Sequence, residues 1–271
     1  MAQPHPTIPG PRRGLAVSLL LASGAVHAVV GAPGASDQGG ALADIPYGSS
    51  GNVYQLQPLL FVGGLGVPDD PLAVAGLASA LSFGYQIGGA GTSLLQLRYT
   101  VSNTSAVESF SDLRFMAFLN PDGEQDPYLD RASESWGAAT AGGPSRREWQ
   151  AFSFDPLDSI PARFRVTASL VDAGPGGDCA QAAGCDVTAA LQWDAPQLGP
   201  MQRWAITLGL SDDAQALSSR WIAASAVGSA DTVLTISGTA VVSAVPDAPG
   251  WAMLACGLPL LVAWARRRRA R

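Results

Sequence analysis

Apolar residues that recur at every second position constrain this chain more than any other feature. A period of two sends alternate side chains to opposite faces of a β-strand, so each such segment is expected to bury one face. The segments are residues 81–87, 95–101, 113–119, 164–170, 187–193, 204–210 and 233–242. No long stretch has the 3.6-residue period of a helix, although residues 73–80 are apolar enough for a short one.

Turn signals rich in Gly, Pro, Asn and Asp separate these segments, as at residues 88–89, 120–123 and 174–177. Many short strands joined by such turns are typical of an antiparallel β-sandwich. Residues 95–105, LQLRYTVSNTS, followed by a strand and Asn-Pro-Asp-Gly, resemble generic bacterial Ig-like surface modules. We therefore predict an all-β sandwich over residues 51–244, Ig-like in type, with a jelly roll as the alternative.

Residues 1–28 have the organisation of a secretory signal peptide. Arg12 and Arg13 precede an apolar core at residues 14–24, and small residues at Val26 and Ala28 favour cleavage by signal peptidase after Ala28. The arginine pair leaves twin-arginine export as an alternative to the general secretory route. Residues 29–50, which are rich in Gly, Ala, Pro and Ser, are predicted to form a flexible leader.

The C-terminal segment, residues 245–271, reads VPDAPGWAMLACGLPLLVAWARRRRAR. A Pro-rich turn precedes an apolar run at residues 251–265 and then a cluster of arginines. As a helix the run would be ~22 Å long, shorter than the ~30 Å hydrocarbon core, and Pro259 would kink it. We expect a single, marginal transmembrane helix whose arginines stay on the cytoplasmic side.

This tail resembles the PEP-CTERM sorting signal, the tag that exosortases recognise in Gram-negative bacteria that make exopolysaccharide. The resemblance covers 27 of the 271 residues, and Asp247 stands where the family usually has Glu. It implies export, retention in the inner membrane, cleavage by an exosortase-type protease, and delivery to the cell surface or the extracellular matrix. The residues that carry it are Val245, Pro246, Asp247, Pro249, Trp251, Arg266, Arg267, Arg268 and Arg269.

Composition excludes most catalytic chemistry from the predicted mature chain, residues 29–246. The chain has no lysine, and its two histidines, His5 and His27, lie in the signal peptide. Histidine-based triads and lysine Schiff bases are therefore absent, which leaves a carboxylate glycosidase as a distant alternative. Nine arginines against 21 acidic residues give a net charge of −12, which disfavours nucleic acid as a partner. We expect a protein that is not an enzyme.

Two cysteines, Cys179 and Cys185, flank a short Gly-containing segment, and in an oxidising compartment they are expected to form a disulfide. A redox pair or metal thiolates are the alternatives, although the spacing is not that of a CxxC motif. The third cysteine, Cys256, lies in the apolar run of the tail.

Residues 120–150 interrupt the strand rhythm and are predicted to form a long loop. Asn120, Asp122, Glu124 and Asp126 place oxygen ligands at alternate positions, as calcium loops do, and calcium is the one candidate cofactor. A solvated acidic loop is the alternative.

Two tryptophans of the same segment, Trp136 and Trp149, are candidates for a sugar-stacking platform, whereas Trp193 and Trp204 lie on apolar strand faces and are expected in the core. The leading hypothesis is an exported surface or exopolysaccharide-matrix protein with a structural or adhesive role. A glycan-binding module and a calcium-stabilised adhesin are the alternatives.

Overall fold

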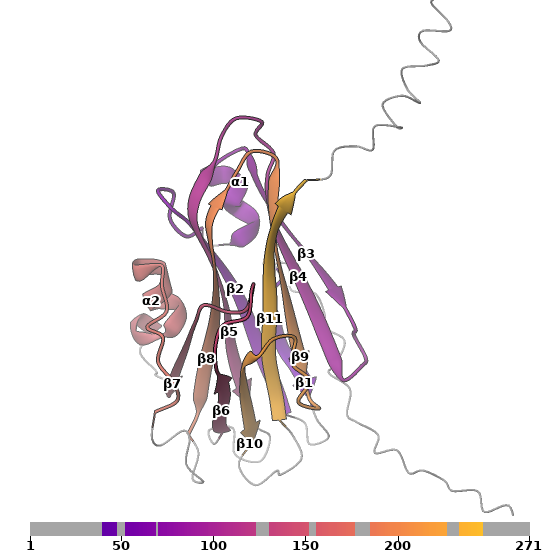
Figure 1. Ribbon diagram of the computed structural model, residues 1–271. Coiled ribbons are helices and arrows are strands. Elements are labelled where there is room, and N and C mark those ends of the chain that lie inside the picture. Colours follow the sequence, from indigo (N-terminus) through magenta and orange to yellow (C-terminus); the bar gives the residue numbers. More distant parts are fainter. Residues whose placement is uncertain are drawn as a thin grey trace, which may run out of the picture.

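The computed structural model describes residues 40–47, 52–68, 70–122, 130–151, 156–176, 185–226 and 233–245. The signal peptide predicted over residues 1–28 and the tail beyond Val245 lie outside this part of the chain. Within it, a five-stranded and a six-stranded antiparallel sheet face one another, which confirms the predicted all-β sandwich (Figure 1).

The five-stranded sheet, which we call sheet A, has the strand order β1-β2-β5-β8-β7. Its strands are β1 Leu42–Tyr47, β2 Asn52–Val62, β5 Phe110–Asp122, β8 Val187–Leu198 and β7 Arg146–Ala151. The six-stranded sheet, sheet B, has the order β3-β4-β9-β11-β10-β6. Its strands are β3 Leu81–Gly88, β4 Leu94–Asn103, β9 Gln202–Ser211, β11 Val233–Ala244, β10 Arg220–Ala226 and β6 Asp130–Trp136.

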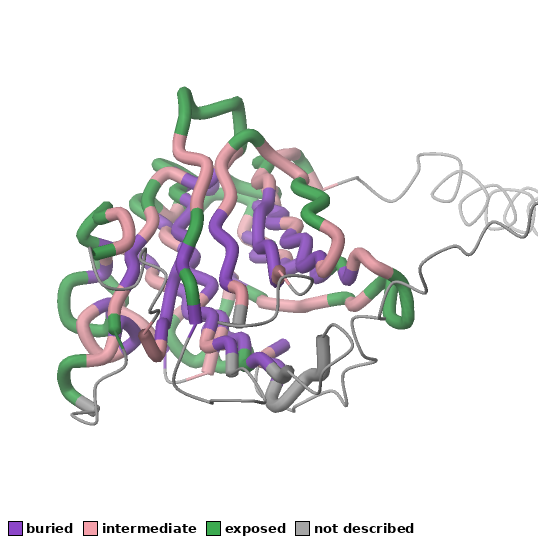
Figure 2. The backbone as a smooth tube through the Cα atoms, turned by 90° about the horizontal axis from the view of Figure 1, so that it is seen from below, coloured by how far each residue is buried: buried purple, intermediate pink, exposed green. Residues whose placement is uncertain are grey.

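Six of the seven segments are strands, and in the five for which a buried face was predicted, residues 81–87, 95–101, 113–119, 187–193 and 204–210, that face lies in the interior. In β4, Leu95, Leu97, Tyr99 and Val101 are fully buried, and the alternate residues of β5 and β9 are buried in the same way. Figure 2 shows most of the buried residues gathered in the strands at the centre of the molecule and most of the exposed residues in the segments around them. Alternation therefore identified the interior face of each of these strands.

Large aromatic side chains fill the centre of the sandwich. The rings of Tyr99 and Phe115, which come from opposite sheets, have centroids 4.8 Å apart, and Trp193 lies 6.2 Å from Phe115. Burial raises the pKa of the Tyr99 hydroxyl, which donates a hydrogen bond of 2.9 Å to the Gly40 carbonyl. Gly238 of β11 provides the space for the indole of Trp193, because a Cβ there would lie 2.8 Å from Cζ2 of that ring.

One segment predicted as a strand is a helix. Residues 164–170 alternate apolar and polar, but the structure has helix α2, Ile160–Thr167, after a 3-10 turn η2, Pro156–Asp158. The buried residues Ile160, Phe164 and Ala168 are spaced by four, which is a helical period, and Val166 is 86% exposed. Ser159 caps the helix by accepting a hydrogen bond of 3.3 Å from the Ala162 amide, and Pro161 lies in the first turn.

The long loop predicted over residues 120–150 is also wrong, because it contains the strands β6 and β7. Both are edge strands with few large apolar side chains, so their alternation is weak in the sequence. The flexible leader predicted over residues 29–50 ends too late, because β1 pairs with β2 from Leu42 onwards. Strands β2 and β10 were likewise not predicted; in β2, Pro58 and the apolar residues of both faces hide the period.

The short helix expected within residues 73–80 is present as α1, Val74–Leu77, after a 3-10 turn η1, Pro71–Ala73. The carboxylate of Asp70 accepts a hydrogen bond of 2.9 Å from the Leu72 amide and so caps this turn. Val74, the first residue of α1, is fully buried.

Helix α2 covers part of the outer face of sheet A (Figure 1). Ile160 and Phe164 of the helix pack on Leu59, Met116 and Ala190, which point away from the interior of the sandwich. This explains why both faces of β5 and β8 are apolar: one face meets sheet B and the other meets α2.

An ion pair attaches α2 to strand β7. Arg163 of the helix pairs with the buried carboxylate of Glu148 and also with Asp158, at 3.0 Å. The second oxygen of Glu148 accepts a hydrogen bond of 3.0 Å from the Val171 amide. Glu148 therefore holds both the helix and the segment that follows it.

Replacement of Gly238 by alanine should destabilise the sandwich by about 1–3 kcal/mol, because the new Cβ would lie 2.7 Å from the Thr207 carbonyl oxygen and 2.8 Å from the Trp193 ring. The matched control is Gly84→Ala in β3, where a Cβ would meet nothing within 4 Å. Urea denaturation measures both. Equal midpoints for the two variants would contradict this account of the core.

Replacement of Arg163 by alanine should loosen α2, because it leaves the buried Glu148 carboxylate without its cation. Since Arg163 is 30% exposed, we expect a loss of only about 1–2 kcal/mol in the local opening free energy of the helix. Hydrogen exchange of the amides of residues 160–167 measures this. Arg165→Ala, in the same helix but exposed, should leave the exchange rates unchanged.

Candidate functional site

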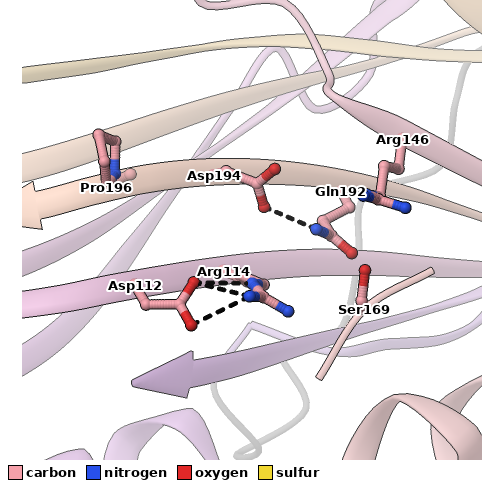
Figure 3. Close-up of a pocket in the computed structure, with 8 residues that line it drawn as sticks. Asp112, Arg114, Arg146, Ser169, Gln192, Asp194 and Pro196 are labelled. Carbon is pink, nitrogen blue, oxygen red and sulfur yellow. Dashed lines mark hydrogen bonds and ion pairs between the residues drawn. The ribbon is translucent and has the colours of Figure 1, made fainter. Parts of the chain in front are cut away.

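A polar pocket opens on the outer face of sheet A, beside the end of α2 (Figure 3). Strands β5, β8 and β7 form its floor, and the segment that follows α2 forms one wall. The cavity measures about 240 Å³, below the ~300–1,000 Å³ of sites for drug-sized ligands. Its lining residues are Asp112, Arg114, Arg146, Ser169, Gln192, Asp194, Ala195 and Pro196.

Register explains why these residues meet. Arg114 lies directly opposite Asp194, and Arg146 lies directly opposite Gln192, so two strand pairs place four polar side chains on one face. Asp112 and Arg114 are two residues apart on β5, as Gln192 and Asp194 are on β8, which keeps each pair on the same face.

One wall of the pocket is closed by Arg114. Its guanidinium group donates to both oxygens of Asp112, at 2.9 and 3.0 Å, and to the Ala168 carbonyl at 2.9 Å. The same group lies 5.4 Å from the ring centroid of Phe61. Asp112 has a φ of 54°, a left-handed conformation that is unusual for a residue with a side chain.

Gln192, fully buried, forms the back of the pocket. Its Oε1 accepts a hydrogen bond of 2.8 Å from the Leu170 amide, and its Nε2 donates one of 2.6 Å to Asp194. Arg146 donates a hydrogen bond of 3.3 Å to the Leu170 carbonyl. The chain after α2 is thus fastened to the sheet through Leu170.

A second polar cluster, the edge junction, joins the two sheets where β6 ends sheet B and β7 ends sheet A. Glu134 accepts hydrogen bonds from Arg147, at 2.9 and 3.0 Å, and from the indole nitrogen of Trp149, at 2.9 Å. Arg147 also pairs with Asp172 at 2.8 Å. The hydrogen bonds with Glu134 raise the pKa of Arg147 further above its usual range, although partial burial acts in the opposite direction.

The edge junction engages both tryptophans that the sequence suggested as a sugar platform. Trp149 is 8% exposed, so it offers no open face to a pyranose ring. The guanidinium groups of Arg147 and Arg220 lie 4.5 and 4.7 Å from the ring centroid of Trp136. Trp149 is thus a packing and hydrogen-bonding group at the sheet edges, and Trp136, which is partly buried, stacks with the two guanidinium groups. A sugar platform on Trp136 stays a prediction.

The predicted disulfide involves Cys185, which is disulfide-bonded. Its backbone forms a two-way bridge with Asp130, at 2.9 and 2.6 Å, beside the start of β6. The predicted partner, Cys179, lies outside the described residues.

The predicted calcium ligands are only partly described. Asn120 lies in β5, where its Oδ1 is buried without a hydrogen-bond partner, and Asp122 is the last residue of that strand. Glu124 and Asp126 lie outside the described residues. In the ranges that the structure covers, no group of three or more His, Cys, Asp or Glu side chains could hold a metal ion. The calcium site stays a prediction.

The first residue of the predicted sorting signal, Val245, donates a backbone hydrogen bond of 2.7 Å to Met201. Pro246, Asp247, Pro249, Trp251 and Arg266–Arg269 lie outside the described residues, as does the apolar run 251–265. No helix within the described ranges combines the length and apolar character that crossing a bilayer requires.

Comparisons with protein-family models, with curated proteins and with solved structures found no significant match. The chemistry of the pocket on sheet A is therefore inferred from its geometry alone. Sequence reasoning missed it, although alternation had placed Gln192 on the polar face of its strand. The pocket could have been suspected from the polar residues that alternate with the core residues of β5 and β8.

Replacement of Trp149 by phenylalanine should destabilise the protein by about 1–2 kcal/mol, because Glu134 loses a buried donor and the core loses volume. The control is Trp221→Phe in β10, a tryptophan that is partly exposed on the outer face of sheet B and whose indole nitrogen forms no hydrogen bond with the described part of the chain. Thermal unfolding of both variants measures the difference. A Trp149→Phe protein as stable as the parent would restore Trp149 as a candidate ligand-contacting residue.

Proposed function

We propose that this chain is an exported, non-enzymatic β-sandwich protein, sorted by an exosortase-type protease to the cell surface or the exopolysaccharide matrix. Its role there is structural or adhesive. Among general types, it is closest to the Ig-like surface modules of bacteria, and a jelly roll is the alternative. Signal peptidase and the exosortase are its processing partners, and the inner membrane holds it before cleavage.

The observation that carries this proposal is the place where the sandwich ends. Strand β11 lies inside sheet B between β9 and β10, and its last residue, Ala244, immediately precedes the first residue of the tail. Val245 makes the last backbone hydrogen bond of the described chain, with Met201. Cleavage between Pro246 and Pro249 would therefore leave every described strand intact.

The engagement of the carboxylates supports a role outside catalysis. Glu134 and Asp172 are bound by Arg147, and Glu148 and Asp158 are bound by Arg163. In the polar pocket, both oxygens of Asp112 are occupied by Arg114, so of its two carboxylates only Asp194 keeps a free oxygen. A glycosidase needs two carboxyl groups that flank the scissile bond.

Mass spectrometry of the C-terminus in membrane and extracellular fractions tests the proposal. We expect a chain that ends between Pro246 and Pro249 outside the cell, because the arginines and the apolar run hold the uncleaved precursor in the membrane. A Pro246→Ala variant should accumulate as precursor.

Pro200→Ala, at an exposed turn of the sandwich, is the control and should be processed like the parent. An intact chain that ends at Arg271 and stays in the membrane would overturn the sorting proposal. The protein would then be an ectodomain with a permanent anchor.

A further inference from the structure

The polar pocket on sheet A keeps binding capacity that the fold itself does not use. Arg146 makes one hydrogen bond, to the Leu170 carbonyl, and forms no ion pair with a carboxylate of the described chain. A guanidinium group carries five N–H donors in a planar fork, so most of its donors remain available. The Arg146 side chain belongs to an exposed residue at the mouth of the pocket.

Asp194 has the complementary unused group. One of its oxygens accepts the hydrogen bond from Gln192, and the other has no partner in the described chain. Arg114 lies directly opposite on β5 but is turned to Asp112, as the close-up shows (Figure 3). The left-handed conformation of Asp112 thus accompanies a pairing that leaves Asp194 without a cation.

The guanidinium group of Arg146 and the carboxylate of Asp194 come from diagonally neighbouring positions on strands β7 and β8. Arg146 is opposite Gln192, and Asp194 is two residues further along the same strand. Diagonal neighbours on one sheet face are ~7–8 Å apart, a span that one small molecule can bridge. Gln192, whose amide has a second N–H, lies opposite Arg146 and beside Asp194. The Ser169 hydroxyl, which donates a hydrogen bond of 3.3 Å to the Leu170 carbonyl, lines the same pocket.

This arrangement selects the chemistry of its ligand. The arginine fork matches a carboxylate, which it binds through two parallel hydrogen bonds. The free oxygen of Asp194 requires a donor. The neutral groups of the lining, the Gln192 amide and the Ser169 hydroxyl, favour hydroxyl groups on the ligand, because a hydroxyl both donates and accepts. A phosphate monoester fits less well, because it would place up to two negative charges beside the Asp194 carboxylate.

We infer that the pocket binds a hydroxylated carboxylate of monosaccharide size, of which a uronate is the simplest sugar. The carboxylate of the ligand pairs with Arg146, and a hydroxyl group donates to Asp194. The sugar is either free or a unit of an acidic polysaccharide. This assignment does not depend on how the C-terminal tail is processed.

Titration of the full-length purified protein with D-glucuronate, followed by calorimetry and by saturation-transfer NMR, tests the inference. We expect a dissociation constant of about 1 mM. Binding should be at least about tenfold weaker for D-glucose, which lacks the carboxylate, and for alanine, which lacks hydroxyls. Polygalacturonate binding more tightly than its monomer, D-galacturonate, would identify a polymer unit as the source, and equal affinity per sugar residue would identify a free sugar acid.

Substitutions of the pocket residues test whether D-glucuronate binds there. Arg146→Gln and Asp194→Asn should each weaken D-glucuronate binding at least about tenfold. Arg98→Gln, an exposed arginine on the outer face of sheet B, is the matched control and should bind like the parent. Because Arg146 also fastens Leu170, its variant is first compared with the parent by thermal unfolding. If it fails to fold, Asp194→Asn decides, since Asp194 is exposed and its carboxylate has one hydrogen-bond partner, Gln192, within the described residues.

Three results would overturn the inference: no saturable binding of D-glucuronate, equal binding of D-glucose or alanine, or full binding by the folded variants. None of these results bears on the sorting proposal, which the terminal mass of the exported chain tests separately.

Discussion

The face-to-face packing of two sheets around Tyr99, Phe115 and Trp193 is the interaction on which the rest of the structure depends. These side chains come from both sheets and are fully buried, so they set the spacing of the layers. The absence of a side chain at Gly238 is part of the same packing, because an added Cβ would meet the Trp193 ring. Every strand that carries a polar or functional side chain is positioned by this interior.

Several of the few arginines in the sandwich hold peripheral elements in place. Arg147 ties the edge of sheet B to the edge of sheet A through Glu134, and Arg163 ties α2 to β7 through Glu148. Arg114 closes one wall of the pocket, and Arg220 donates to the carbonyl groups of Gly137 and Pro144. In a chain with a large excess of acidic residues, the ion pairs of Arg114, Arg147 and Arg163 also neutralise carboxylates. Arg146 is exceptional because its guanidinium group remains unneutralised next to a cavity.

The outer face of sheet A therefore has two parts with different chemistry. Where α2 covers it, Leu59, Met116 and Ala190 are buried beneath Ile160 and Phe164. Beyond the end of the helix the same strands carry charged residues and an amide, and the cavity opens there. If the proposed export and ligand binding hold, the strands beneath the polar pocket supply a stiff support and the pocket supplies selectivity.

The sequence by itself determined the fold class and the interior faces of five strands, because a period of two encodes the direction of each side chain locally. It also placed Trp193 and Trp204 in the core and limited the catalytic inventory through composition. It failed where local pattern and tertiary contact disagree. Residues 164–170 alternate like a strand, yet Ile160, Phe164 and Ala168 are buried with a helical spacing, and the loop expected over residues 120–150 contains two edge strands.

Only the tertiary structure decided which strands lie side by side, and with that the pocket and the contacts of Trp136 and Trp149. Arg146 and Gln192 are 46 residues apart in sequence, and Arg114 and the Ala168 carbonyl are 54 residues apart. Register between distant strands depends on packing energy summed over whole faces, which no local window contains. The burial of Trp149 against Glu134 has the same origin, since it follows from the meeting of two sheet edges.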